Sequence, residues 1–155
     1  MAQNSSPVST KSAEHEHIEK LIATKLPASP IYAYLLSDVR VMSASKGHVV
    51  CRLLLSKTHM NSAGGLHGSV SATIIDWMGG MAISSQTLKD SSGVSVDIHA
   101  TYLSSVKDGD EIEIEGLADK VGASMSFTKI HIFRVDDGQR GRLVVSGSHT
   151  KFTRS

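Results

Sequence analysis

The sequence predicts an α+β fold, in which one long apolar helix packs against about six strands. Residues 68–86 carry apolar side chains around much of a helix circumference, which is typical of a buried helix. On both sides of this segment apolar residues alternate with other residues, as in Val49, Cys51, Leu53 and Leu55, and this period of two indicates strands. The strand connections are short and rich in turn residues, so we expect antiparallel hairpins.

The N-terminal part of the chain predicts a tail followed by two short helices. Residues 1–12 are rich in serine and form a predicted flexible tail, whereas residues 13–155 form one predicted domain. The domain begins with apolar residues at helical spacing, and Pro27 ends this segment. Ser29 and Pro30 then supply an N-cap and a first-turn proline for a second short helix.

Turn signals separate the predicted strands. A first hairpin joins the strand around Val41 to the strand at residues 49–55, with the turn at Lys46 and Gly47. The last connection, residues 136–141, is expected to be a loop. The four strands predicted after the long helix cover residues 94–104, 111–120, 124–135 and 142–153.

Size and composition limit the classes of function. A chain of 155 residues is long enough for one sizeable core, and a net charge of +1 gives no reason to expect nucleic acid or an anionic membrane as partner. No run of about 18 apolar residues is present and no apolar segment follows Met1, so we expect neither a membrane span nor a signal peptide. The lone Cys51 lies in the buried phase of its strand and fits a reducing compartment. We therefore expect an intracellular protein, in the cytoplasm or the mitochondrion.

One segment places the residues of a carbonyl-binding site around the start of the long helix. Asn61 supplies an amide, Gly68 leaves its backbone N–H open to a ligand, and Asp76 puts a carboxylate on an otherwise apolar helix. The first N–H groups of a helix have no partner within it and carry the positive end of its dipole. An oxygen that gains negative charge would therefore be stabilised beside His67 and Gly68.

These residues, together with Val94, Ser95 and Asp97, resemble the hotdog-fold acyl-CoA thioesterases of the phenylacetate type. The resemblance covers roughly residues 14–153. It implies a hotdog fold, an antiparallel sheet wrapped around one central helix, and an acyl-CoA substrate. We expect no cofactor and no metal.

The resemblance also implies a role for each residue. The Gly68 N–H and the Asn61 amide would polarise the thioester carbonyl. Asp76 would be the general base for water or a nucleophile that forms an anhydride, and Ser95 would position the water. His67 would orient Asn61 or stabilise the departing thiolate, although a structural role remains open.

Helix geometry predicts that two chains build one site. Asp76 follows Gly68 by eight residues, which places it about 12 Å further along the helix. The two groups can reach one carbonyl only if two chains pair with antiparallel helices, so we expect a homodimer. The glycine pair Gly79 and Gly80, costly within a helix, is then interpreted as a close approach of a neighbouring backbone. Association into a homotetramer is also expected.

The predicted substrate-binding residues lie in two places. Coenzyme A is expected near the turn formed by Lys120, Gly122, Ala123 and Ser124, although Ala123 stands where many relatives carry a basic residue. The basic C-terminal end, with Lys151 and Arg154, is an alternative for its phosphates. Acyl specificity is expected to depend on apolar residues beside Asp76, among them Trp77, Met78 and Met81.

Two other functional classes remain open. A hotdog hydratase or dehydratase would pair the aspartate with a histidine about five residues later, where this chain has Met81. A catalytically silent acyl-CoA or acyl-carrier binding module gives no reason for a carboxylate on an apolar helix. We expect Asp97 to share the face of Ser95, and His149 to be solvent-facing or structural.

Overall fold

The computed structural model describes residues 10–153 of the chain. The greater part of the predicted tail, residues 1–9, and the candidate phosphate ligand Arg154 lie outside the described residues. No helix within residues 10–153 is long and apolar enough to cross a membrane. The α-helices are α1 (Ala13–Thr24), α2 (Pro30–Leu36) and α3 (Gly68–Thr87), and short 3-10 turns cover Leu26–Ala28 (η1) and Lys57–His59 (η2).

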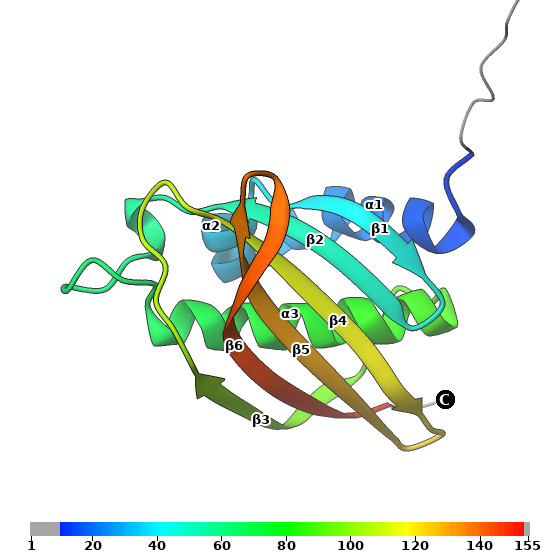
Figure 1. Ribbon diagram of the computed structural model, residues 1–155. Helices are drawn as coiled ribbons and strands as arrows, with labels where there is room; N and C mark the ends of the chain where they lie inside the picture. Colours follow the sequence, from blue (N-terminus) through cyan, green and yellow to red (C-terminus); the bar gives the residue numbers. More distant parts are fainter. Residues whose placement is uncertain (1–9, 154–155) are drawn as a thin grey trace, which may run out of the picture.

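Six antiparallel strands form one sheet that curves around α3 (Figure 1). Their order across the sheet is β1-β2-β4-β5-β6-β3, so the strand that follows α3 forms an edge. This arrangement confirms the predicted hotdog fold. The strands are β1 (Arg40–Ser45), β2 (His48–Leu54), β3 (Val94–Tyr102), β4 (Glu111–Val121), β5 (Met125–Asp136) and β6 (Gln139–Phe152).

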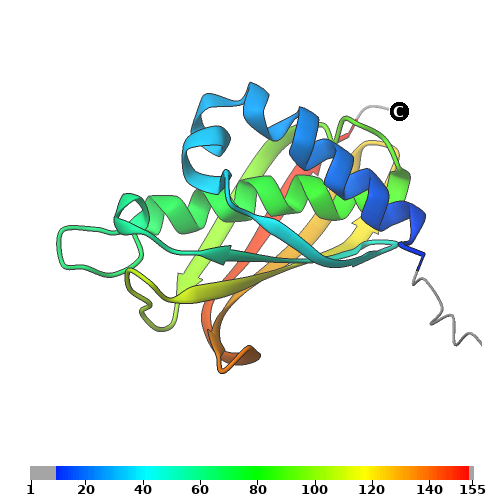
Figure 2. The same ribbon diagram turned by 90° about the horizontal axis from the view of Figure 1, so that it is seen from above.

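The long helix α3 is the centre of the hydrophobic core. Its residues Ile74, Ile75 and Met78 are fully buried between the helix and the sheet. Seen from above, α1 and α2 lie alongside α3 next to β1 (Figure 2). Cys51 is fully buried on β2, as its alternation predicted, and burial raises the pKa of its thiol to about 12. Cys51 is therefore a core residue with an unreactive thiol.

The connection between β5 and β6 is shorter than the predicted six-residue loop. Asp136 pairs with Gln139, and Asp137 and Gly138 alone form the turn, both with positive φ angles of 49° and 75°. Aspartate and glycine are favoured at these two positions of a type I′ hairpin turn, whose twist matches that of the strands. The strand β6 therefore begins three residues earlier than the sequence predicted, at Gln139 rather than Arg142.

The start of α2 also differs from the prediction. Ser29 occupies the N-cap position with an extended backbone, but its side chain makes no capping hydrogen bond. Pro30 begins the helix as predicted, where its missing N–H costs nothing. The proline, and not a serine cap, is the local feature that favours this helix start.

Candidate active site

The loop before α3 fixes the amide of Asn61. Its Oδ1 accepts hydrogen bonds from the N–H groups of Ala63 at 2.9 Å and Gly65 at 3.1 Å. The loop is in turn anchored by the Leu66 N–H, which donates to the Val106 carbonyl at 2.9 Å. Within residues 10–153 no acceptor is found for Nδ2 of Asn61. The loop thus orients the amide so that its N–H groups are available to an external oxygen.

The first residue of α3 presents a second donor. His67 is the N-cap, and its Nδ1 accepts the Ser69 N–H at 3.1 Å. The phenol of Tyr102 donates to the Gly68 carbonyl at 3.0 Å, and a side chain at Gly68 would stand only 3.3 Å from that hydroxyl. The described part of the chain provides no acceptor for the Gly68 N–H. This N–H is therefore open to a ligand at the positive end of the helix dipole.

The capping bond limits what His67 does. Its Nδ1 serves the backbone and hydroxyl of Ser69, the hydroxyl lying 2.7 Å away. No hydrogen bond to Asn61 is found among the described residues, so the predicted orienting role has no structural support. The imidazole is exposed, and its predicted role toward the thiolate stays a prediction.

Three side chains surround the carboxylate of Asp76, two turns further along α3. The Ser95 hydroxyl donates to Oδ1 at 3.0 Å, and the Tyr32 hydroxyl donates to Oδ2. The Nε2 atom of His149 lies 3.6 Å from Oδ1. The Asp76 side chain is still 33% exposed, so water can reach a carboxylate whose orientation is fixed.

Behind Ser95 lies a fully buried imidazole. Nε2 of His149 is 2.8 Å from the Ser95 hydroxyl, which already gives its proton to Asp76. Nε2 must therefore carry the proton and donate to Ser95, and this assigns the tautomer of the neutral ring. Burial, followed by repulsion from Lys151, lowers the pKa of His149 below its ordinary 6.5. Of the two predicted alternatives, the solvent-facing one is wrong, because His149 is buried on the face of β6 that packs against α3.

The glycine pair in α3 makes room for these side chains. A Cβ at Gly79 would stand 2.4 Å from Nδ1 of His149, and one at Gly80 would stand 2.9 Å from the Ser92 hydroxyl. Within residues 10–153 side chains approach these glycines closely, and not the neighbouring backbone that the sequence predicted. Lys151, only 8% exposed, lies beyond Gly80, and burial lowers the pKa of its amine.

A bulge in β3 separates Ser95 from Asp97. Ser95 lies opposite Lys151, and regular pairing would place Asp97 opposite His149, two residues away on β6. Asp97 instead lies opposite Thr150, only one residue away. Residues directly opposite each other share a face of the sheet, so Ser95 faces α3 with Lys151 and Asp97 faces the other way. The prediction that the two residues share a face is wrong, because strict alternation fails at a bulge.

Within one chain the open N–H of Gly68 and the carboxylate of Asp76 stay apart. Gly68 and Asp76 belong to the same uninterrupted helix, which separates them by about 12 Å along its axis. The edge strand β3, which carries Ser95, exposes three apolar side chains: Val94 is 65% exposed, Val96 54% and Ile98 39%. An edge of this kind is a template for pairing with another strand.

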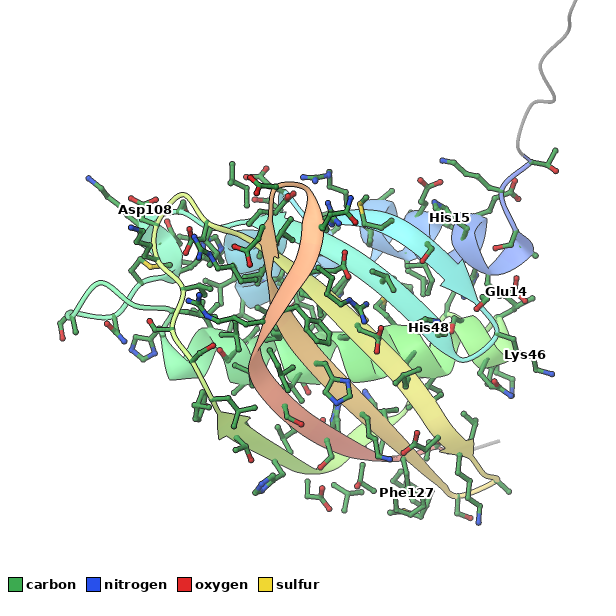
Figure 3. The ribbon with its side chains drawn as sticks, viewed as in Figure 1. Glu14, His15, Lys46, His48, Asp108 and Phe127 are labelled. Atoms are coloured by element: carbon green, nitrogen blue, oxygen red, sulfur yellow. The ribbon has the colours of Figure 1, made fainter. Side chains whose placement is uncertain are left out.

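The described residues line a cavity at each end of the sheet. In Figure 3, Phe127 labels the end with the larger cavity and Asp108 the end with the smaller one. The larger, about 620 Å³, lies at the β4–β5 turn, and Gly122 and Ala123 line it together with Val94, the neighbour of Ser95. The smaller, about 330 Å³, lies beside the Asn61 loop.

The other predicted substrate-binding residues lie elsewhere. Lys120 is exposed on β4, and the Ser124 carbonyl accepts the Thr153 N–H at 2.8 Å. Trp77 is 3% exposed in the hydrophobic core, so its contact with an acyl chain stays a prediction.

Comparison with known proteins decides the family. The model of the thioesterase superfamily matches residues 63–140, half of the chain. The chain belongs to the thioesterase superfamily. It is 34% identical over 117 residues to human acyl-coenzyme A thioesterase 13, which covers 76% of this chain and 81% of that protein. A putative esterase of Schizosaccharomyces pombe is 35% identical over 124 residues, 79% of this chain and 74% of that protein.

A solved structure agrees with this assignment. Zebrafish thioesterase superfamily member 2 superposes with a TM-score of 0.80 at 32% identity, over 91% of this chain and 99% of that chain. The superposition supports the hotdog topology of the chain. As a thioesterase, the protein is an enzyme that hydrolyses thioesters.

Sequence reasoning missed Tyr32, assigned Lys151 to the phosphates of CoA rather than to the surroundings of Asp76, and gave His149 no catalytic part. Tyr32 is 44 residues from Asp76 in the chain, and His149 is 54 residues from Ser95. One sequence signal was available for His149. By the alternation of β6, His149 and Lys151 share one face of the strand, and Gly79 leaves space on the helix face opposite them.

Proposed function

We propose that the protein hydrolyses acyl-CoA thioesters to a free carboxylic acid and CoA. The observation that carries this proposal is the carboxylate of Asp76, which is open to water while Ser95 and Tyr32 fix its orientation. Human acyl-coenzyme A thioesterase 13, by its name an acyl-CoA hydrolase, supports the choice of CoA as the thiol.

In the proposed reaction, Asn61 Nδ2 and the Gly68 N–H hold the thioester oxygen. A water molecule gives a proton to Asp76 and forms a bond to the carbonyl carbon, and the oxygen becomes an oxyanion between the two donors. The carbon–sulfur bond then breaks, the carbonyl re-forms, and the departing CoA thiolate takes up the proton that Asp76 received from water, which restores the carboxylate. We assign Asp76 as the general base, because its carboxylate is open to water and hydrogen bonds at both oxygens fix its orientation.

The proposed site is shared by two protomers of a homodimer. Two antiparallel α3 helices related by a two-fold axis would bring Asp76 of one protomer to the Gly68 N–H of its partner. Two observations support this assembly: the separation of the two groups along α3, and the exposed apolar edge of β3, which carries Ser95.

We place CoA at the β4–β5 turn. The cavity there is close to Ser95 through Val94, and Gly122 and Ala123 line it. Its size, about 620 Å³, is in the range of ordinary ligand sites. Since Ala123 offers no charge, backbone N–H groups of the turn and Lys120 are the proposed phosphate partners.

The test is release of free thiol from a panel of acyl-CoAs with acyl groups of different length and with an aryl group. We expect hydrolysis by the wild-type protein and almost none by Asp76→Ala. A hydratase would instead change the absorbance of a 2-enoyl-CoA without release of thiol, and a binding module would bind acyl-CoA and leave it intact. Either of these outcomes refutes the proposed function.

A further inference from the structure

The phenol of Tyr32 makes a contact that the chemistry of thioester hydrolysis does not by itself explain. Tyr32 lies on α2, and its partly buried ring packs against the hydrophobic core. A phenylalanine would pack in the same way, so burial accounts for the ring but not for the hydroxyl. The hydroxyl donates to Oδ2 of Asp76, from a helix that contributes no other side chain hydrogen bond to this carboxylate.

The carboxylate is thereby held from two different elements. Ser95 on β3 donates to Oδ1, and Tyr32 on α2 donates to Oδ2. Each carboxylate oxygen keeps one further lone pair, and two donors on opposite oxygens fix the plane in which these lone pairs point. With Ser95 alone, the carboxylate could still turn about its Cβ–Cγ bond, because that torsion has broad minima.

We propose that Tyr32 is a positioning residue, whose hydroxyl holds the Asp76 carboxylate at the angle from which it takes a proton from water. This inference rests on the proposed function, and it gives the N-terminal helix α2 a part in the reaction. Burial of the phenol, together with the hydrogen bond and charge of Asp76, raises the pKa of Tyr32 above its ordinary 10. The phenol therefore stays protonated, and remains a donor, throughout the neutral pH range.

The chain offers a matched control on the same helix. Tyr34 is 70% exposed, and no hydrogen bond of its hydroxyl is found among the described residues. We expect Tyr32→Phe to lower kcat about tenfold with KM changed less than twofold, because a hydrogen bond to a charged group is lost while the substrate contacts remain. Tyr34→Phe should leave both constants unchanged.

A second measurement tests the hydrogen bond without relying on activity. The midpoints of thermal unfolding of Tyr32→Phe, Asp76→Ala and the double variant form a double-mutant cycle. If the bond exists in solution, the two single effects do not add, because either substitution alone removes it. Additive effects would overturn the proposal, as would a kcat of Tyr32→Phe equal to that of the wild type.

A rise in KM with unchanged kcat would make Tyr32 a substrate-binding residue and would also refute its positioning role. Failure of the proposed function has a different signature, since wild-type protein would then release no thiol and this inference would fall with it. Thiol release that is lost in Asp76→Ala but kept in Tyr32→Phe would refute the role of Tyr32 alone.

Discussion

Mixing two defective variants tests whether two chains build one site. Asp76→Ala removes the base, which lies two turns into α3, and Asn61→Ala removes a proposed carbonyl donor in the loop before α3. If the site is shared, a mixed dimer has one site with both defects and one site with neither. Random exchange of equal amounts makes half of the dimers mixed, and half of their sites are intact, so activity should recover to about one quarter of the wild-type value.

The structure supplies a matched control for this experiment. Ser95 donates to Asp76 of the same chain at 3.0 Å, so both residues belong to the same half of the site. A mixture of Asp76→Ala with Ser95→Ala therefore has one defect in every site of every dimer, and its activity should not recover beyond the average of the two variants.

The assay is thiol release after subunit exchange, with native mass spectrometry to establish that mixed dimers have formed. A site built within one chain would leave one defect in every site of the first mixture also. Proven exchange without recovery of activity would therefore refute the shared site, and recovery in both mixtures would refute the division of residues between its halves.

Four further substitutions test the site. Asp76→Ala should fold normally and lose at least about a hundredfold in kcat, the scale of general base catalysis, and near-normal turnover would remove Asp76 from the chemistry. Asn61→Ala should lower kcat but leave the Kd for CoA unchanged in calorimetry, whereas equal losses would reassign Asn61 to loop structure. Gly79→Ala should destabilise the protein by about 1–3 kcal/mol in urea unfolding, because its Cβ would overlap the His149 ring, and no loss would contradict this packing. Folding lowers the pKa of His149, so its contribution to the free energy of unfolding is present above pH 6.5 and is lost as pH falls from there. His149→Gln should therefore flatten the dependence of the unfolding free energy on pH below 6.5. An unchanged slope would assign this dependence to other groups.

Local patterns predicted most of the fold correctly. Alternation in β2 and apolar spacing in α3 depend on neighbours within a few residues, and both are visible in one sequence. The same rule failed where the structure departs from regular repetition. The bulge between Ser95 and Asp97 reverses the face of every later residue of β3, and no residue type in that segment announces it.

The candidate site divides in the same way. Asn61 and Gly68 lie on one loop and one helix start, so their proximity is visible in a single sequence. Tyr32 and His149 reach Asp76 and Ser95 across 44 and 54 residues of chain. Contacts of this kind depend on how α2 and β6 pack against α3, and tertiary packing is what a single sequence does not display.

Gly79 lowers the intrinsic stability of α3, and a chain of hydrogen bonds links this glycine to the orientation of Asp76. Glycine within a helix is about 1 kcal/mol less favourable than alanine, yet here it creates the space that the His149 ring occupies. From that space the imidazole donates to Ser95, and Ser95 in turn donates to Asp76. Because a fully buried neutral ring has no freedom to turn away, the serine hydroxyl is left with one acceptor for its proton, the carboxylate. A local weakness of α3 thus stabilises the orientation of the one carboxylate that the helix carries.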